Sequence, residues 1–140
     1  MAKYDAFGTL LYKGTSGAGT AYAQVQSISG PGLSLDTEDV TSHDSTGAWE
    51  EVVGTILRSG EISMDIVYDP ATATHKNAAG GLLYDLASRA PITLTLKFPD
   101  AATTEWTFSA LVTAFEPSMP HDGALTASVT FKPTGAMTLV

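Results

Sequence analysis

Three residue types that a hydrolase could use stand side by side at His43, Asp44 and Ser45. A nucleophile, its base and the acid that orients the base must converge from separate parts of a fold, so three neighbours in one segment cannot form a catalytic triad. The sequence also lacks the Gly-x-Ser-x-Gly motif that exposes a nucleophilic serine. A turn, in which Asp and Ser side chains bond to backbone amides, explains the segment better. We therefore predict no catalytic residue and no enzymatic activity.

The acidic residues that begin at Asp36 raise the question of a calcium site. Counted from Asp36, an EF-hand loop needs Gly at its sixth position and Glu at its twelfth, but Thr41 and Gly47 stand there. The three histidines lie far apart in the sequence and there is no cysteine, so the closely spaced ligand pairs of a zinc site are missing. Residues 14–19 are glycine-rich but lack the Gly-Lys-Ser/Thr of a phosphate-binding loop. We predict no metal and no cofactor.

The composition describes an acidic, folded domain. The 140 residues include 15 Asp and Glu against 7 Lys and Arg, which gives a net charge of -8. Such a surface repels phosphates, so lasting binding to nucleic acid or to an anionic membrane is disfavoured. Charged residues make up 16% and hydrophobic residues 44%, which argues against an acidic disordered tail. No apolar run approaches the ~20 residues of a membrane helix, and we expect one domain, residues 1–140, without membrane attachment.

The negative charge is concentrated in one quarter of the chain. Residues 36–69 contain nine of the acids and a single base, Arg58, so this segment alone sums to -8. A solvated loop face would explain the pattern, and so would an acidic surface placed for a purpose. The charge pattern alone leaves both interpretations open.

Hydrophobic alternation predicts six or seven strands and little helix. The only helical candidate is 75–88, where leucines recur at helical spacing. Alternation with period two indicates strands covered on one face, so the expected fold is all-β: a β-sandwich of two packed antiparallel sheets with one short flanking α-helix. Residues 1–20 are expected to form an N-terminal arm and 135–140 an irregular tail. The predicted strands cover residues 21–28, 33–40, 59–68, 92–98, 104–116 and 125–132.

A long segment without a clean period, residues 41–57, interrupts the strands. A compact domain seldom contains so long a connection unless it is functional. An exposed loop with several large apolar residues is expected to dock on another molecule. The predicted contact residues are Trp49, Val52, Val53, Ile56 and Leu57. The strand faces are polar but carry few charges that would block strand addition, which also favours self-association.

The strand at 59–68 has the clearest face rule. One face is apolar and belongs in the core; it consists of Ile62, Met64, Ile66 and Tyr68. The alternate residues must then face water. The polar candidates on that face are Glu61, Ser63 and Asp65.

A series of segments, in order along nearly the whole chain, resembles the tail tube proteins of phages. The segments are ISGPGLSLDTEDVTSHDSTGAWEE at 28–51, GEISMDIVYDP at 60–70, the short helix that follows, Phe-Pro-Asp at 98–100, TFSALVTAFEPS at 107–118 and DGALTASVTFKPTG at 122–135. The resemblance is to the major tail tube protein of long, non-contractile tails, which is related to the tube proteins of contractile tails and type VI secretion.

The resemblance implies a structural protein of the virion tail, assembled in the host cytoplasm. It implies stacked hexameric rings in which one sheet of each subunit lines a channel, so that DNA is a partner only in transit. The other implied partners are the protein itself, a tape-measure protein, a tail terminator and a tip or baseplate hub. Many relatives carry an additional immunoglobulin-like domain, whereas residues 1–140 are expected to be the tail tube domain alone.

The resemblance also assigns expected roles to the residues singled out above. Glu61, Ser63 and Asp65 become candidates to line the lumen, where acidic groups would keep DNA from adhering. The loop 41–57 would make contacts between rings. Two alternatives stay open: the tube of a contractile tail, gene-transfer particle or type VI-like secretion system, and a monomeric β-sandwich that binds carbohydrate.

Overall fold

The computed structural model describes residues 3–5, 7–14, 19–100 and 102–139. Within these ranges the chain forms strands, one α-helix and a 3-10 turn. The strands are β1 (Leu10–Lys13), β2 (Thr20–Ala21), β3 (Val25–Ser29), β4 (Leu33–Asp39), β5 (Val52–Ser59), β6 (Ile62–Val67), β7 (Ile92–Lys97), β8 (Glu105–Ser118) and β9 (Thr126–Thr138); the helix is α1 (Leu82–Ser88) and the 3-10 turn is η1 (Thr46–Ala48).

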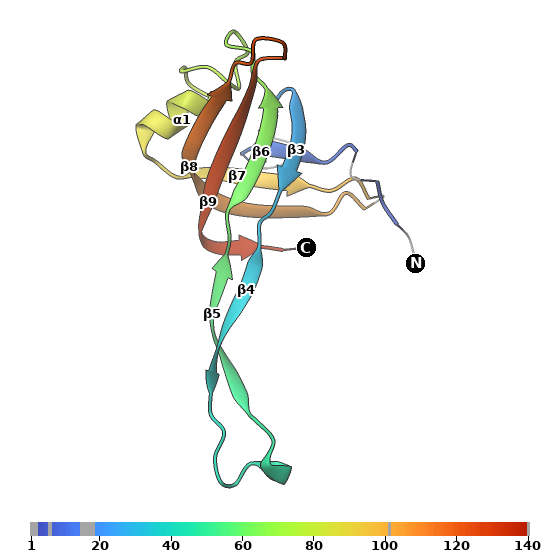
Figure 1. Ribbon diagram of the computed structural model, residues 1–140, viewed down its shortest axis with the longest axis vertical. Coiled ribbons are helices and arrows are strands. Elements are labelled where there is room, and N and C mark those ends of the chain that lie inside the picture. The colour runs from blue at the N-terminus through green and yellow to red at the C-terminus, as the bar shows by residue number, and fades with distance from the viewer. Residues whose placement is uncertain (1–2, 6, 15–18, 101, 140) are drawn as a thin grey trace.

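The body of the molecule is one antiparallel sheet with strand order β2-β1-β7-β8-β9-β6-β3, and β4 with β5 forms a separate two-stranded ribbon. The all-β class with one helix agrees with the sequence analysis. The two packed layers expected there are halves of this single sheet: β7 and the first part of β8 run across the direction of β6 and β9 (Figure 1). The long strand β8 shifts register near Ser109 and again near Ala114, and such bulges bend a strand so that it can serve both layers. Alternation identifies a strand's faces but not its bonded neighbours.

The core lies between the crossing halves of the sheet. Ile62, Met64 and Ile66 are fully buried, as the face rule predicted. The other buried apolar residues come from both halves of the sheet, from α1 and from the segment after β2: Leu11, Tyr22, Leu82, Leu94, Leu96, Phe108, Ala110, Val112, Ala127, Val129 and Phe131. Trp106 is half-buried and packs edge to face on Phe98, with ring centroids 5.1 Å apart, as expected of a core residue.

Both chain ends contribute more to the sheet than the sequence indicated. Strand β1 lies between β2 and β7, and its Leu11 is buried, so residues 10–13 are not part of a loose arm. Strand β9 continues to Thr138, which pairs with Thr107, so residues 135–138 are not an irregular tail. The sequence did not reveal these two extensions, because the four residues of β1 are too few to show alternation and because a glycine such as Gly135 usually marks the end of a strand. Residues 1–2, 6, 15–18 and 140 of the predicted arm and tail lie outside the described residues.

The helix is shorter than predicted. It begins at Leu82, with Gly81 in extended conformation as its N-cap, instead of at residue 75. Two glycines in succession disfavour helix, so residues 75–81 form turns. His75 is fully buried there, and its Nε2 donates to the Ala23 carbonyl at 2.8 Å. Its role is to anchor this turn to the segment between β2 and β3.

Candidate functional site

The ribbon of β4 and β5 projects from the body as an arm, which we call the arm hereafter (residues 33–59; Figure 1). Its root is closed by the Gly60 amide, which donates to the Gly32 carbonyl at 2.6 Å. Gly30 precedes it with φ +98, and a Cβ there would lie 2.5 Å from the Glu61 carbonyl oxygen. Only glycine satisfies both demands, so this position fixes how the arm leaves the body.

One face of the arm is apolar. The register pairs Leu35 with Leu57 and Leu33 with Ser59, and beyond a bulge it pairs Asp39 with Val52. Residues two apart on β4 and their partners on β5 share a face. Gly54 adds no side chain here and is covered by Leu35. This face, which we call the apolar face, presents Leu33, Leu35, Val52 and Leu57, all 45–80% exposed, with Thr37 and Asp39 toward the tip.

The opposite face of the arm is charged. The Arg58 guanidinium donates from Nε to Asp36 Oδ2 at 2.7 Å, and the register pairs Glu38 with Val53. The Thr55 hydroxyl donates to the Asp36 carbonyl at 3.1 Å, beside the bulge. An arm with one apolar and one charged face is suited to lie against another surface by its apolar side only.

The tip of the arm is an ordered turn. The Thr41 amide donates to Asp39 Oδ1, and hydrogen bonds from the side chain and backbone of Thr41 hold the pKa of Asp39 below its usual value. His43, Asp44 and Ser45 lie here, and the Ser42 amide donates to Ser45 Oγ at 3.0 Å. This agrees with the predicted turn.

Trp49 is presented to solvent at this tip. Its side chain is 77% exposed, and its indole lies against the backbone of Gly47, where a Cβ would be only 3.1 Å from the ring. Gly47 has φ +66, which glycine adopts without strain. The ring thus lies against the backbone of the tip and stays exposed.

The five contact residues predicted from the sequence are all at least 46% exposed, but only Trp49 lies in a loop. Residues 52–57 belong to β5, so the connection spans 40–51 instead of 41–57. A free ribbon has no buried face, and its bulge breaks the alternation, so no period marked this strand in the sequence. Leu33 and Leu35 were missed as contact residues because their alternation resembles that of an ordinary half-buried strand.

A polar face covers β3, β6, β9 and the end of β8, and we call it the polar face. Cross-strand pairing aligns Ser27, Asp65, Ser128 and Glu116 in one row. A second row contains Ser29, Ser63, Thr130 and Ala114. The Ser27 hydroxyl donates to Asp65 Oδ2 at 3.0 Å, and this hydrogen bond links the two neighbouring side chains of the row.

Glu116 is an acidic residue of the polar face that the sequence analysis missed. The bulge between Val112 and Ala114 reverses the alternation of β8, so that Phe115 points inward and Glu116 outward. Pro117 after Phe-Glu was the available signal, since proline in a strand marks an edge or a bulge. Glu61 and Ser63 are exposed beside Asp65, as predicted, so this face carries three acids, together with one base, Lys132 of β9.

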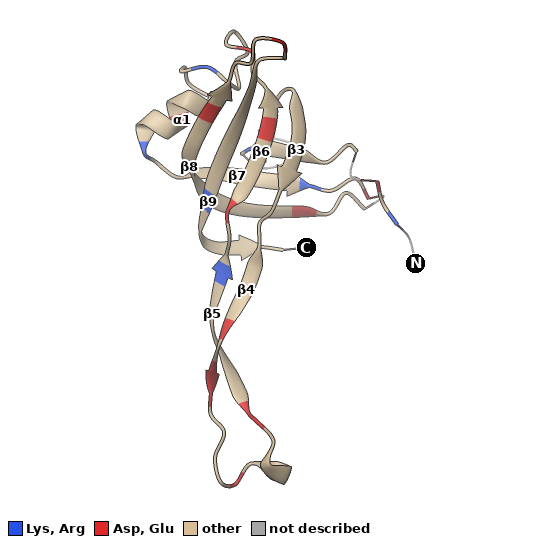
Figure 2. Ribbon diagram, viewed as in Figure 1, with Lys and Arg blue, Asp and Glu red and all other residues tan. Residues whose placement is uncertain are grey.

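The acidic segment is divided between these two surfaces (Figure 2). Six of its nine acids lie on the arm and its tip, and Glu61 and Asp65 lie on the polar face; the ninth, Asp69, follows the end of β6 and belongs to neither surface. Among the residues that the structure describes, no three Asp, Glu or His side chains gather as metal ligands would. No helix in the described ranges has the length and apolar character to cross a membrane.

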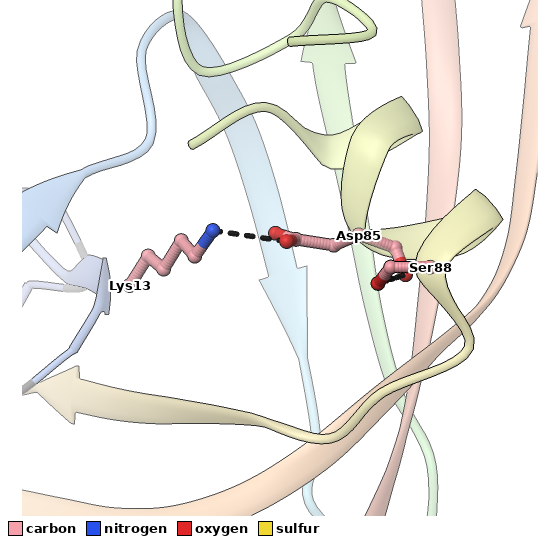
Figure 3. A network of polar contacts seen from close by, with 3 residues as sticks. All are labelled: Lys13, Asp85 and Ser88. Atoms are coloured by element: carbon pink, nitrogen blue, oxygen red, sulfur yellow. Dashed lines mark hydrogen bonds and ion pairs between the residues drawn. The ribbon is translucent and has the colours of Figure 1, made fainter. Parts of the chain in front are cut away.

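One charged pair among the described residues is partly buried and belongs to neither surface. Lys13 Nζ lies 2.9 Å from Asp85 Oδ1 and ties β1 to α1 (Figure 3). Asp85 is 4% exposed, and its Oδ2 has no hydrogen-bond partner among the described residues. Burial, and secondly the charge of Asp85, raises the pKa of the Tyr22 hydroxyl, so Tyr22 stays neutral.

This pair yields a stability prediction. Lys13→Met should lower the free energy of unfolding by about 2–3 kcal/mol, because it leaves the Asp85 carboxylate buried without a partner. Lys13 is 27% exposed, so Asp85→Leu should cost less, since the lysine can turn to water. The double variant should be more stable than Lys13→Met alone. Urea unfolding of the unassembled protein measures all three, and strictly additive losses would contradict this account.

An exposed apolar arm beside a polar sheet face is typical of one class of protein, the structural subunits of larger assemblies. The comparisons identify the family. A family model for phage tail tube protein matches residues 10–139, and the chain belongs to this family. It is a structural component of phage-like tails and not an enzyme. The comparison with curated proteins found no match.

Solved structures have the same fold. A chain of the virion of a native gene transfer agent particle matches with a TM-score of 0.75 and 15% identity, over 99% of each chain. A chain of the anti-feeding prophage baseplate matches with a TM-score of 0.71 and 12% identity, over 99% of this chain and 97% of that one. The SPP1 tail tube matches with a TM-score of 0.58 and 11% identity, over 91% and 72%.

Proposed function

We propose that this protein assembles into stacked hexameric rings that form a tail tube, and that DNA passes through the tube into a host cell. The observation that carries the proposal is membership of the tail tube family over residues 10–139. The exposed apolar face of the arm supports it, because a subunit that worked alone would lose stability and solubility by displaying it. A monomeric carbohydrate-binding module has no such support.

The arm is the contact between rings in this proposal. Trp49 and Leu57 are 77% and 80% exposed and extend beyond the body, where only another subunit can cover them. Val52, Val53 and Ile56 lie on the same strand and complete the contact set proposed from the sequence. Of these, Val52 and Leu57 lie on the apolar face and are expected to contribute most.

The polar face is the channel lining in this proposal. Its rows carry Ser and Thr with acids at Glu61, Asp65 and Glu116 against one cation, Lys132 of β9, so the surface is negative overall and repels phosphates. Repeated around a ring, each acid would form a belt of carboxylates at one depth. Repulsion of phosphates by these belts would keep the DNA moving.

The partners proposed are those of a tail. The neighbours include chains from structures described as a sheath/tube terminator, a tube-terminating cap and a baseplate. By analogy this tube would meet a terminator at one end and a tip or baseplate hub at the other. A tape-measure protein inside the growing tube would complete the set.

A tube enclosed by a sheath is the second candidate. The observation that favours it is the fold match to chains of contractile injection systems, which is closer than the match to SPP1. A sheathed tube needs a protein contact on its outer surface, whereas a bare tube does not. Tubes incubated with candidate sheath proteins from the same genome would separate the two.

Electron microscopy of the purified protein tests the main proposal. We expect tubes of uniform diameter whose end-on class averages have six-fold symmetry, together with a monomer or single-ring population at low concentration. Sedimentation across a concentration series should show a critical concentration, as open polymers do. A protein that stays monomeric in every condition, or rings of another symmetry, would overturn the proposal.

A further inference from the structure

A pocket of about 600 Å³, mainly apolar but lined also by Asp5, Asp100 and Thr104, lies at the root of the arm. Its walls include Ile28, Leu96, Phe98 and Trp106, and Gly30, which directly precedes the arm, closes one side. Tyr4 and Asp5 of the N-terminal segment form its rim. Pockets of this size with aromatic walls accept flat apolar groups, and the indole of tryptophan is the largest that a protein offers.

The same chain presents an indole that has no pocket. Trp49 is held against Gly47 at the tip, and the strands between tip and root put it more than about 20 Å from the pocket of its own chain. The arm thus has an apolar anchor at one end and an apolar receptor at the other. A patch and a separate pocket on one molecule join different copies head to tail, and such a contact continues as an open polymer when the rotation between copies does not close a ring.

The exposed area of the arm points to a second copy as the occupant. Eight apolar side chains on it are 44–80% exposed: Leu33, Leu35, Val40, Trp49, Val52, Val53, Ile56 and Leu57. Those on the apolar face and at the tip, which are Leu33, Leu35, Trp49, Val52 and Leu57, expose on the order of 600 Å², which approaches the ~800 Å² that one partner of a stable interface buries. A small ligand in the pocket would leave the apolar area of the arm exposed. When the arm of one copy docks on another copy, the same contact covers that area and fills the pocket.

We propose that the pocket at the arm root receives Trp49 from the arm of a second copy of this chain. This rests on the proposed function, since it names the surface that the arm contacts. The T-shaped pair of Phe98 and Trp106 supplies aromatic walls for the indole. Each copy then gives one anchor and accepts one, so the contact repeats without limit along the assembly.

Two complementary variants test the contact. Trp49→Ala removes the anchor and keeps the pocket, and Asp5→Trp fills the pocket from its exposed rim and keeps the anchor. Each alone should raise the critical concentration for polymers at least about 100-fold. Their mixture should form limited adducts, because the intact anchor of one fits the intact pocket of the other. Phe7→Trp is the matched control, since Phe7 is 90% exposed on the same segment and does not line this pocket.

The outcomes separate this contact from the proposed function. Circular dichroism first establishes that each variant is folded, and Trp49→Phe, which keeps a ring, should polymerise with only a several-fold weaker contact. If Asp5→Trp forms polymers at the normal critical concentration, the assignment of the pocket is wrong, while the proposal that the protein forms a tail tube still stands. Failure of the mixture to form adducts would overturn it as well. Absence of tubes from the unmodified protein would instead overturn the function.

The sequence offers a second measurement. Because the chain contains no cysteine, single cysteines can be placed at Ala48, beside the anchor, and at Thr104, on the pocket wall. Oxidised polymers of the double-cysteine protein should yield a ladder of disulfide-linked chains under denaturing conditions. Assembled polymers without a ladder would contradict the contact.

Discussion

Tubes should not form when the apolar face of the arm is made polar by Leu35→Thr, Val52→Thr and Leu57→Thr together. Threonine keeps the β propensity of these positions, so the ribbon and the body should stay folded. Each side chain contributes about 1–2 kcal/mol when a neighbour buries it, so losing three should raise the critical concentration by roughly 10³-fold. Electron microscopy and sedimentation measure the assembly, and circular dichroism checks the fold.

Two neighbouring valines provide the control. Val52 and Val53 are 50% and 46% exposed but lie on opposite faces of the arm. Val52→Thr alone should weaken assembly measurably, whereas Val53→Thr should have a much smaller effect, because its face carries the Asp36–Arg58 pair and Glu38. Normal tubes from the triple variant would show that the arm is not an assembly element. Equal effects of the two single changes would show that both faces are covered.

The sequence was most informative where one strand face is buried. Ile62, Met64 and Ile66 alternate with exposed residues, and the burial of a face leaves a pattern that can be detected. The same logic fails for β5, because the arm is a free ribbon whose two faces are both exposed. The apolar content of Val52 and Leu57 therefore predicted exposed side chains suited to an interface, which stays a prediction, while their secondary structure could not be inferred.

Pairing between distant strands was the other missing information. Glu116 joins Asp65 on one row only because β9 lies between β8 and β6, and the bulge at Ala114 sets which side Glu116 faces. Neither the order of strands in a sheet nor a single-residue bulge leaves a mark on hydrophobic alternation. Pocket walls have the same origin, since Ile28 and Trp106 are 78 positions apart in sequence.

The row through Asp65 and Glu116 makes the proposal of an acidic channel testable. Asp65→Lys with Glu116→Lys converts a repulsive row into one that attracts phosphates and leaves the buried side of the sheet untouched. We expect particles of normal appearance, because neither side chain packs in the core. DNA should leave them at least about tenfold more slowly at low salt, since each lysine can pair with passing phosphates.

Salt and matched charge changes decide the interpretation. The delay should shrink as ionic strength rises, because salt screens the attraction over the ~8 Å Debye length at physiological strength. Asp122→Lys, 96% exposed in the loop between β8 and β9, makes the same kind of change away from the polar face and should not slow release. Asp65→Asn with Glu116→Gln, which removes the acids without adding cations, should give an intermediate rate. The measurement is the rate of DNA ejection from purified particles. An unchanged rate and salt dependence in the double lysine variant would place the polar face outside the channel. The acids of the arm, Asp36, Glu38 and Asp39, would then be the candidates for the channel lining.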